Sequence, residues 1–321
     1  MKKALLNILA AAAALSMLLT SGCSGIAASK DKMTEHTFES TAPESTDDSS
    51  APEETTGSPS ISVNTYSTDV FVYDLDAAAF IMRSGTSSVI YPASTTKLLT
   101  ALCALSILDP ETVVEAGEEV RLIKEHSSIA YILPGHKLSV EMLIEAMLLP
   151  SGNDAAYVLA AACGKKLSAD DGMQPQQAVD TFVSEMNAYA KNLGCRSSNF
   201  TAPDGFCGSE HYSTLEDMAK ISAAAAQNEI ITKYSRLESD DVTYASGHTN
   251  HWENSNRQLH ADSEFYNQYV TGLKTGSLED YYCLITLYER GGRYIIGVFG
   301  SEGEDDRYTD TRNIIKAIEA R

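Results

Sequence analysis

Hydrophobic and polar positions divide the 321-residue chain into three parts. A nearly unbroken apolar run covers residues 4–19, whereas residues 24–64 consist largely of Ser, Thr, Glu, Asp and Pro with almost no aliphatic side chains. From residue 65 to the end, apolar positions recur at the spacings of strands and helices. We therefore predict an N-terminal signal peptide over 1–23, a disordered acidic tether over 24–64 and a folded domain over 65–321.

The folded domain has strand patterns near both of its ends and helix patterns between them. Short β-branched and aromatic runs predict strands over residues 70–73, 77–83, 284–288 and 294–299. Runs with 3.6-residue spacing predict helices over residues 98–105, 140–149, 155–163, 181–193, 214–227 and 312–320. We expect one α/β (α+β) domain, in which a helical lobe is inserted into a sheet and a ligand groove lies between the two.

The N-terminus has the pattern of an export signal. Lys2 and Lys3 precede the apolar run, and the small residues Thr20-Ser21-Gly22 follow it, directly before Cys23. This ending resembles a bacterial lipobox, which implies lipidation of Cys23. We expect an extracytoplasmic protein anchored to the bacterial cell membrane through its N-terminal lipid. The alternative is an ordinary secretory signal with a chance cysteine; the run is short for a retained membrane helix, which needs about 20 residues.

The composition narrows the choice of partners. A formal net charge of −20 argues against binding to nucleic acid or to anionic membrane surfaces, and no Gly-rich phosphate loop is present. His248 and His251 lie three residues apart without a supporting carboxylate or helix pattern, and no pair of cysteines has the CxxC spacing. We therefore expect no metal site and no cofactor.

Five cysteines follow Cys23, and an odd number cannot all form disulfides. Cys103 and Cys163 lie in apolar helical patterns, which favours buried thiols. Cys195 and Cys207 flank a turn-rich segment, where an oxidising exterior would allow them to pair.

Three short polar motifs carry the candidate chemistry: Ser94-Thr95-Thr96-Lys97, Ser151-Gly152-Asn153 and Lys274-Thr275-Gly276. Similar short patterns also occur by chance, at residues 29–32, 62–64 and 197–199. The surroundings separate the two sets. Ser94 and Lys97 begin an apolar helix, where a spacing of three places them on one face. The second motif follows a helix that stops at Pro150, and the third precedes a strand. Each motif alone is also compatible with a plain helix start, cap or turn.

With their flanks, these motifs resemble those of the serine D-alanyl-D-alanine carboxypeptidases, the low-molecular-mass penicillin-binding proteins. The matching segments are Tyr91-Pro92-Ala93-Ser94-Thr95-Thr96-Lys97, Leu149-Pro150-Ser151-Gly152-Asn153-Asp154-Ala155-Ala156 and Gly272-Leu273-Lys274-Thr275-Gly276, with weaker matches at 201–205, 212–214 and 252–256. The resemblance implies a β-lactamase/DD-peptidase-like fold, an antiparallel sheet flanked by helices with an all-helical lobe. It also implies that 65–321 is a DD-peptidase catalytic domain. The expected substrates are peptidoglycan stem peptides, from which the terminal D-Ala is removed, and the expected inhibitors are β-lactam antibiotics.

The resemblance also implies a role for each motif residue. Ser94 is the expected nucleophile, Lys97 its base and Ser151 a proton relay, since a serine hydroxyl needs a neighbouring base. Burial beside a second cation, Lys274, would lower the pKa of Lys97. The expected substrate-binding residues are Asn153, Lys274, Thr275, Gly276 and Ser277. Asn153 would hold the peptide amide, and Lys274 and Thr275 would bind the terminal carboxylate. Gly276 would let the substrate lie against a strand edge, and the N–H of Ser277 would join that of Ser94 in an oxyanion hole.

One segment departs from the family pattern and leaves three alternatives open. After Gly276 the family has an Ala-Gly before the next strand, whereas this chain continues with a shorter Ser277-Leu278-Glu279-Asp280. DD-endopeptidase action on cross-links would use the same residues. A class A β-lactamase would need a Glu-x-x-Leu-Asn loop, and the nearest candidate, residues 185–187, falls in a predicted helix. An inactive peptidoglycan-binding lipoprotein is supported only by the altered segment.

Overall fold

The computed structural model describes residues 60–206 and 208–321. The expected signal peptide, Cys23, most of the expected tether and Cys207 lie outside these residues. Ile61 and Val63 fall just before the expected domain start at residue 65, and they pack against the core of the sheet. In the part of the chain that the structure describes, no helix is long and apolar enough to cross a membrane.

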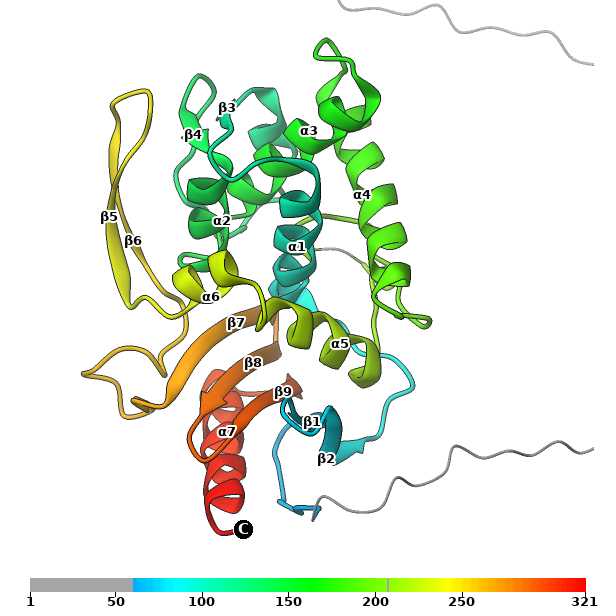
Figure 1. Cartoon of the computed structure of the whole chain (residues 1–321), viewed down its shortest axis with the longest axis vertical. Helices are drawn as coiled ribbons and strands as arrows, with labels where there is room; N and C mark the ends of the chain where they lie inside the picture. Colours follow the sequence, from blue (N-terminus) through cyan, green and yellow to red (C-terminus); the bar gives the residue numbers. More distant parts are fainter. Residues whose placement is uncertain (1–59, 207) are drawn as a thin grey trace, which may run out of the picture. The chain divides into compact units, whose positions relative to one another are not determined.

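A five-stranded antiparallel sheet forms one half of the domain (Figure 1). Its strand order is β2-β1-β9-β8-β7. The strands are β1 (Asp69–Asp74), β2 (Ala79–Gly85), β7 (Val270–Leu278), β8 (Tyr281–Glu289) and β9 (Arg293–Ser301). The N-terminal strand β1 pairs with the C-terminal strand β9, so both ends of the domain meet in the middle of the sheet. β7 forms one edge of the sheet.

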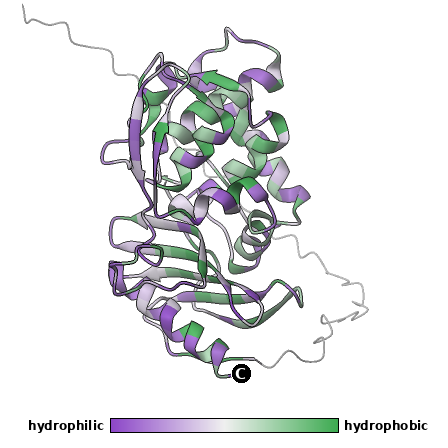
Figure 2. Ribbon diagram, turned by 60° about the vertical axis from the view of Figure 1, so that its left-hand side comes forward, coloured by the Kyte–Doolittle hydropathy of each residue, from purple (hydrophilic) through white to green (hydrophobic). Residues whose placement is uncertain are grey.

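Alternating side chains divide the core between the two faces of the sheet. Val70 and Val72 pack on one face together with the C-terminal helix α7 (Glu304–Glu319), whereas Phe71 points into the larger core on the other face. In α7, Ile314, Ile315 and Ile318 are buried, and hydrophilic residues cover its outer side (Figure 2). The sheet is therefore covered on both faces.

The helical lobe contains α1 (Lys97–Ile107), α2 (Val140–Leu148), α3 (Asn153–Ser168), α4 (Pro175–Asn192), α5 (Leu215–Ala225) and α6 (Glu229–Ser235). The Ala-rich helix α3 contacts α1, α2 and α4, because small side chains let helices approach it on several sides. α5 packs against β1 and β9 and joins the lobe to the sheet. Short 3₁₀ helices cover Ala93–Thr96 and Glu118–Leu122.

The predicted fold, a mixed α/β domain with an antiparallel sheet and a helical lobe, is confirmed. Several helices are longer than predicted, among them α3, which continues past residue 163 to Ser168. α4 begins at Pro175, a residue that favours the first turn of a helix, and α7 begins with the acidic residues Glu304 to Asp306. Two hairpins were not predicted, β3 (Val113–Glu115) with β4 (Lys137–Ser139) and β5 (Ser239–Thr243) with β6 (Thr249–Glu253).

The predicted buried thiols at Cys103 and Cys163 are confirmed. Cys195 is also a buried free thiol, and its Sγ lies 3.6 Å from the carbonyl oxygen of Asp217. The sequence left open a pairing of Cys195 with Cys207, which lies outside the described residues; in this structure Cys195 is a free thiol.

Candidate active site

Ser94 lies on a tight turn that leads into α1. The turn is held by Thr95, whose N–H and Oγ1 both donate to the carbonyl of Pro92, at 3.0 and 2.5 Å. Ala93 has a φ of +49°, an unfavourable value for a residue with a side chain. Strained backbone of this kind often accompanies functional positions. Ser94 is partly exposed, and Lys97 in the first turn of α1 is fully buried.

Lys97 lies at the centre of a buried polar cluster. Its Nζ is 2.7 Å from Ser94 Oγ, 2.7 Å from Asn153 Oδ1, 3.1 Å from the carbonyl oxygen of Asp204 and 3.5 Å from Ser151 Oγ. A neutral amine has two N–H groups and one lone pair. The N–H groups match the Asn153 and Asp204 oxygens, which can only accept, and the lone pair then faces the Ser94 hydroxyl. This geometry suits removal of the serine proton.

The environment of Lys97 favours that neutral form. The pKa of Lys97 is lowered to about 8, chiefly because burial disfavours the ammonium, while the nearby carboxylates of Asp204 and Asp154 act in the opposite direction. Burial was one of the two causes expected from the sequence; the other, the neighbouring cation Lys274, is not among the main causes of the lowered pKa.

Ser151 and Asn153 enter the cluster from the start of α3. Ser151 has a φ of +61°, which is unusual for serine, and its hydroxyl faces Lys97. Asp154, the next residue after Asn153, accepts hydrogen bonds from the N–H groups of Ala130 and Ile132 at 2.8 Å. These bonds attach the start of α3 to the neighbouring loop and so fix Ser151 and Asn153 in place.

The third motif lies on the edge strand β7. Lys274 is almost fully buried, and its Nζ donates to Thr275 Oγ1 at 3.2 Å. Thr275 Oγ1 also shares a 2.6 Å hydrogen bond with Ser255 Oγ. β7 is the last strand in the order of the sheet, and a sheet edge is where an extended peptide can add as a further strand.

Arg307 is a buried cation that the sequence analysis did not select. From α7 it donates to the carbonyl of Gly276 at 3.0 Å and to Ser277 Oγ at 3.2 Å, so it holds the end of the third motif. The pKa of Lys274 is lowered well below its usual value, first by burial and then by the positive charges of Lys97 and Arg307. Arg307 also forms an ion pair with Glu304 at 2.7 Å, and a substrate carboxylate would place a negative charge directly beside Lys274.

Two glycines allow close packing behind Ser94. A Cβ on Gly276 would lie 3.0 Å from Ala93 Cβ and 3.1 Å from the carbonyl oxygen of Pro92. A Cβ on Gly205 would overlap the carbonyl of Ala93, at 1.9 Å. From the sequence, we expected Gly276 to make room for the substrate. In the structure, the turn that carries Ser94 occupies the space that a side chain at Gly276 would need.

These groups surround a hollow between the helical lobe and β7. The residues that line it include predicted ones, Ser94, Asn153 and Ser277, and ones that were not predicted, His126, Ser127, Ser128, Gly205, Phe206 and Leu278. Thus all three motifs converge on one groove. Asp204 and Ser255, which contact predicted site residues, were not themselves predicted. Both belong to segments that match the family more weakly, 201–205 and 252–256, and this weaker match was the sequence feature that could have identified them.

The altered segment after Gly276 lies at the end of β7. Its Leu278 closes the strand, Glu279 and Asp280 form the turn to β8, and Glu279 has a φ of +45°. Both carboxylates are exposed, and Leu278 alone of these three lines the hollow. The candidate β-lactamase residues 185–187 lie within helix α4, as predicted.

Comparisons with known proteins agree with this geometry. Residues 54–302 match the model of the D-alanyl-D-alanine carboxypeptidase family. A D-alanyl-D-alanine carboxypeptidase of Streptomyces sp. (strain K15) is 30% identical over 74% of this chain and 84% of its own length. The D-alanyl-D-alanine carboxypeptidase DacF of Bacillus subtilis is 28% identical over 72% of this chain, but that match covers 57% of the relative. The chain thus spans little more than half of some relatives.

Solved structures share the fold. The Streptomyces K15 DD-transpeptidase matches with a TM-score of 0.71 and 26% identity, over 81% of this chain and 100% of that structure. Penicillin-binding protein D2 from Listeria monocytogenes, in an ampicillin-bound form, matches with a TM-score of 0.63 and 24% identity, over 80% of this chain and 99% of that structure.

Proposed function

Because the chain belongs to the D-alanyl-D-alanine carboxypeptidase family of serine hydrolases, we propose that its groove removes the terminal D-Ala from peptidoglycan stem pentapeptides. The observation that carries this proposal is the buried Lys97 amine 2.7 Å from the Ser94 hydroxyl, with a pKa lowered to about 8. A base of this kind turns a weak nucleophile into a reactive one at neutral pH.

In the first step, Lys97 Nζ takes the proton of Ser94 while Ser94 Oγ bonds to the carbonyl carbon of the penultimate D-Ala. The backbone N–H groups of Ser94 and Ser277 then stabilise the oxyanion. The bond from carbon to nitrogen breaks, and the leaving D-Ala amine receives a proton from Lys97 through Ser151. This leaves an ester between Ser94 and the peptide, which water hydrolyses to regenerate the serine.

The substrate binds against β7. Lys274 and Thr275 bind the terminal carboxylate, in a place where the positive charge of Arg307 lies close to Lys274. The substrate backbone pairs with the free edge of β7, and Asn153 holds its amide. A β-lactam places its carboxylate and its strained amide in the same positions, so we expect it to acylate Ser94.

A second outcome for the acyl-enzyme is transfer to an amine. The K15 relative is named a carboxypeptidase in one comparison and a DD-transpeptidase in the other, which favours a test of both fates. Cleavage of cross-linked peptides by the same residues, a DD-endopeptidase activity, is the further alternative. All three reactions share the Ser94 ester and differ only in the group attached to the scissile bond or in the acceptor.

The decisive experiment incubates the purified protein with pentapeptide muropeptides and with cross-linked dimers, in the presence and absence of glycine as an amine acceptor. Mass spectrometry should show loss of one D-Ala from the pentapeptides. Loss of dimers would instead indicate endopeptidase action, and a glycine adduct would indicate transfer. A fluorescent penicillin should label the protein, and labelling that persists in Ser94→Ala would overturn the assignment of the nucleophile.

We also propose that the protein is a lipoprotein that works outside the cytoplasm, attached to the bacterial membrane through Cys23. The support is the sequence pattern of a charged start, an apolar run and small residues before Cys23. The predicted tether would give the groove a reach of roughly 35 Å from that anchor. Metabolic labelling with a lipid analogue should mark the protein but not its Cys23→Ser variant; equal labelling of both would refute the anchor.

A further inference from the structure

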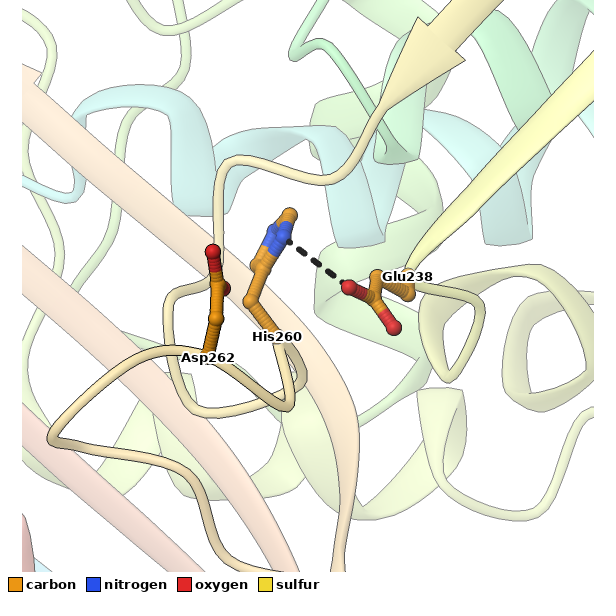
Figure 3. A group of neighbouring side chains, drawn as sticks. All are labelled: Glu238, His260 and Asp262. Carbon is orange, nitrogen blue, oxygen red and sulfur yellow. Dashed lines mark ion pairs between the residues drawn. The ribbon is translucent and has the colours of Figure 1, made fainter.

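A histidine and two carboxylates converge at a place outside the groove. Glu238 lies just before β5, and His260 and Asp262 lie in the loop that connects β6 to β7. One nitrogen or oxygen atom of each side chain lies within 4.8 Å of the others, and in the view of Figure 3 the His260 ring stands between the carboxylates of Glu238 and Asp262. His260 is partly buried, whereas Glu238 and Asp262 are exposed and free to adjust.

The hydrogen bond of His260 fixes which ring nitrogen faces Glu238. Nε2 lies 2.5 Å from the carbonyl oxygen of Asn254, which can only accept, so Nε2 carries the hydrogen. In the neutral ring, Nδ1 then presents a lone pair toward Glu238. Asn254 is itself anchored, since its side chain donates to the Leu237 carbonyl at 2.8 Å. Histidines that bind metals are commonly oriented by such a bond from the other nitrogen to a backbone carbonyl.

The spacing of the facing atoms suits a shared ion better than a direct contact. His260 Nδ1 and Glu238 Oε1 are 3.6 Å apart. This exceeds the usual N–H···O distance of about 2.7–3.2 Å. It is close to the edge of a tetrahedron whose ligand bonds are about 2.0–2.1 Å, which measures about 3.3 Å. A small rotation of the exposed Asp262 would bring a third ligand to the same centre.

We propose that Glu238, His260 and Asp262 form a binding site for a divalent ion of the zinc class, with water completing the coordination. The two carboxylates balance the charge of the ion. An imidazole ligand favours Zn²⁺ over Ca²⁺ and Mg²⁺, which prefer oxygen ligands alone. This site does not depend on the proposed reaction and lies apart from the Ser94 ester chemistry.

A bound ion would join two separate parts of the chain. It would tie the base of the β5–β6 hairpin, at Glu238, to the loop that leads into β7. Asn254, which holds His260, is followed by Ser255, whose hydroxyl bonds Thr275 in the third motif. The ion therefore stabilises the loop that holds Ser255 against Thr275 of β7.

The test uses the purified full chain, freed of metal with a chelator and titrated with Zn²⁺ while heat release and thermal unfolding are followed. At Zn²⁺ concentrations 100-fold above the dissociation constant, we expect the melting temperature to rise by about 5 °C or more. Ca²⁺ and Mg²⁺ at the same concentration should produce little change. His260→Ala and Asp262→Asn should each weaken Zn²⁺ binding by about tenfold or more. Asp262→Asn is the safer variant, because Asp262 is exposed and its replacement preserves shape.

The chain offers a matched control in His251. This exposed histidine also lies between two carboxylates, but Nδ1 faces Asp241 at 2.8 Å whereas Nε2 faces Glu253 at 3.9 Å. Because its two nitrogens point in different directions, the three groups cannot share one ion, and His251→Ala should bind Zn²⁺ as well as the unmodified chain does. Unchanged binding in both Asp262→Asn and His260→Ala, or loss of binding in His251→Ala, would overturn the proposal.

Discussion

The two walls of the groove each bury one lysine, but the charges around the two lysines are opposite. On the helical wall, Lys97 lies near the carboxylates of Asp204 and Asp154, and on the strand wall, Lys274 lies near Lys97 and Arg307. Burial lowers both pKa values. The neighbours then partly offset this effect at Lys97 and strengthen it at Lys274.

This difference separates two functions that one residue type can perform. An amine with a pKa of about 8 exists in both forms near neutral pH, so it can accept a proton and return it. An amine whose pKa is lowered by neighbouring cations gains from an anionic ligand, since a carboxylate favours its charged form. Burial alone would not distinguish a base from an anion-binding site; the neighbouring charges do.

Replacing the base should produce the largest effect. We expect Lys97→Met, which keeps the length of the side chain and removes the amine, to slow acylation by penicillin about 10²- to 10⁴-fold. Stopped-flow measurement with a fluorescent penicillin gives the rate. Thermal unfolding of the variant checks that the buried methionine is tolerated. A rate within threefold of the unmodified protein would show that Lys97 is not the base.

The pH dependence of the unmodified protein tests the same lysine without a mutation. Because the neutral amine is the active form and its pKa is about 8, acylation should increase with pH up to about 8 and then level off. Below that value the rate should fall about tenfold per pH unit. The measurement is the acylation rate from pH 5 to 9 in buffers of constant ionic strength. A flat profile would contradict the assignment.

Replacing the second lysine should have a smaller and more selective effect. Lys274→Met should reduce kcat/KM about 10- to 100-fold for peptides that end in a free carboxylate, because it removes a charge-assisted hydrogen bond. The same peptides with an amide terminus should be affected little. Equal losses for both peptides would place Lys274 outside carboxylate binding.

The motif residues that form the two walls of the groove could be predicted from sequence, because each motif and its flanking residues form one short continuous segment. Ser94 lies in a 3₁₀ turn three residues before Lys97, which begins α1, and Ser151 follows α2 and Pro150. Four strands of the sheet and most helices were also predicted from periodicity, and the structure confirms them. Strand β7 was not predicted, and the third motif lies within it instead of preceding a strand. Convergence of the three motifs followed from the family resemblance rather than from any single pattern.

The surroundings of the two lysines could not be predicted in the same way. Arg307 lies in α7, far from the motifs in sequence, and only the packing of α7 on β8 and β9 brings it to Gly276. Asp204 contacts Lys97 through its backbone carbonyl, a group that every residue has. Hairpin β5–β6 was missed because its exposed polar residues, such as Asp241 and His251, lack a strong alternating pattern.

The smallest predicted effect extends the comparison to two glutamates on one helix. In α2, the pKa of Glu145 is raised to about 8, first by burial and then by Asp240, whereas the pKa of Glu141 is lowered, first by its hydrogen bond with Lys233. Glu145 therefore binds a proton in the folded state that it loses in the unfolded state, so its contribution to stability declines as pH rises from about 4.5 to 8.

Glu145→Gln should accordingly leave the stability at pH 5 nearly unchanged and increase the free energy of unfolding by about 1 kcal/mol at pH 9. Glu141→Gln is the matched control, because it removes a carboxylate that stabilises the fold above its unfolded pKa, and it should therefore decrease stability at pH 9. Urea unfolding of both variants at the two pH values provides the measurement. If both substitutions changed stability in the same direction at pH 9, the opposite pKa directions assigned to Glu145 and Glu141 would be wrong.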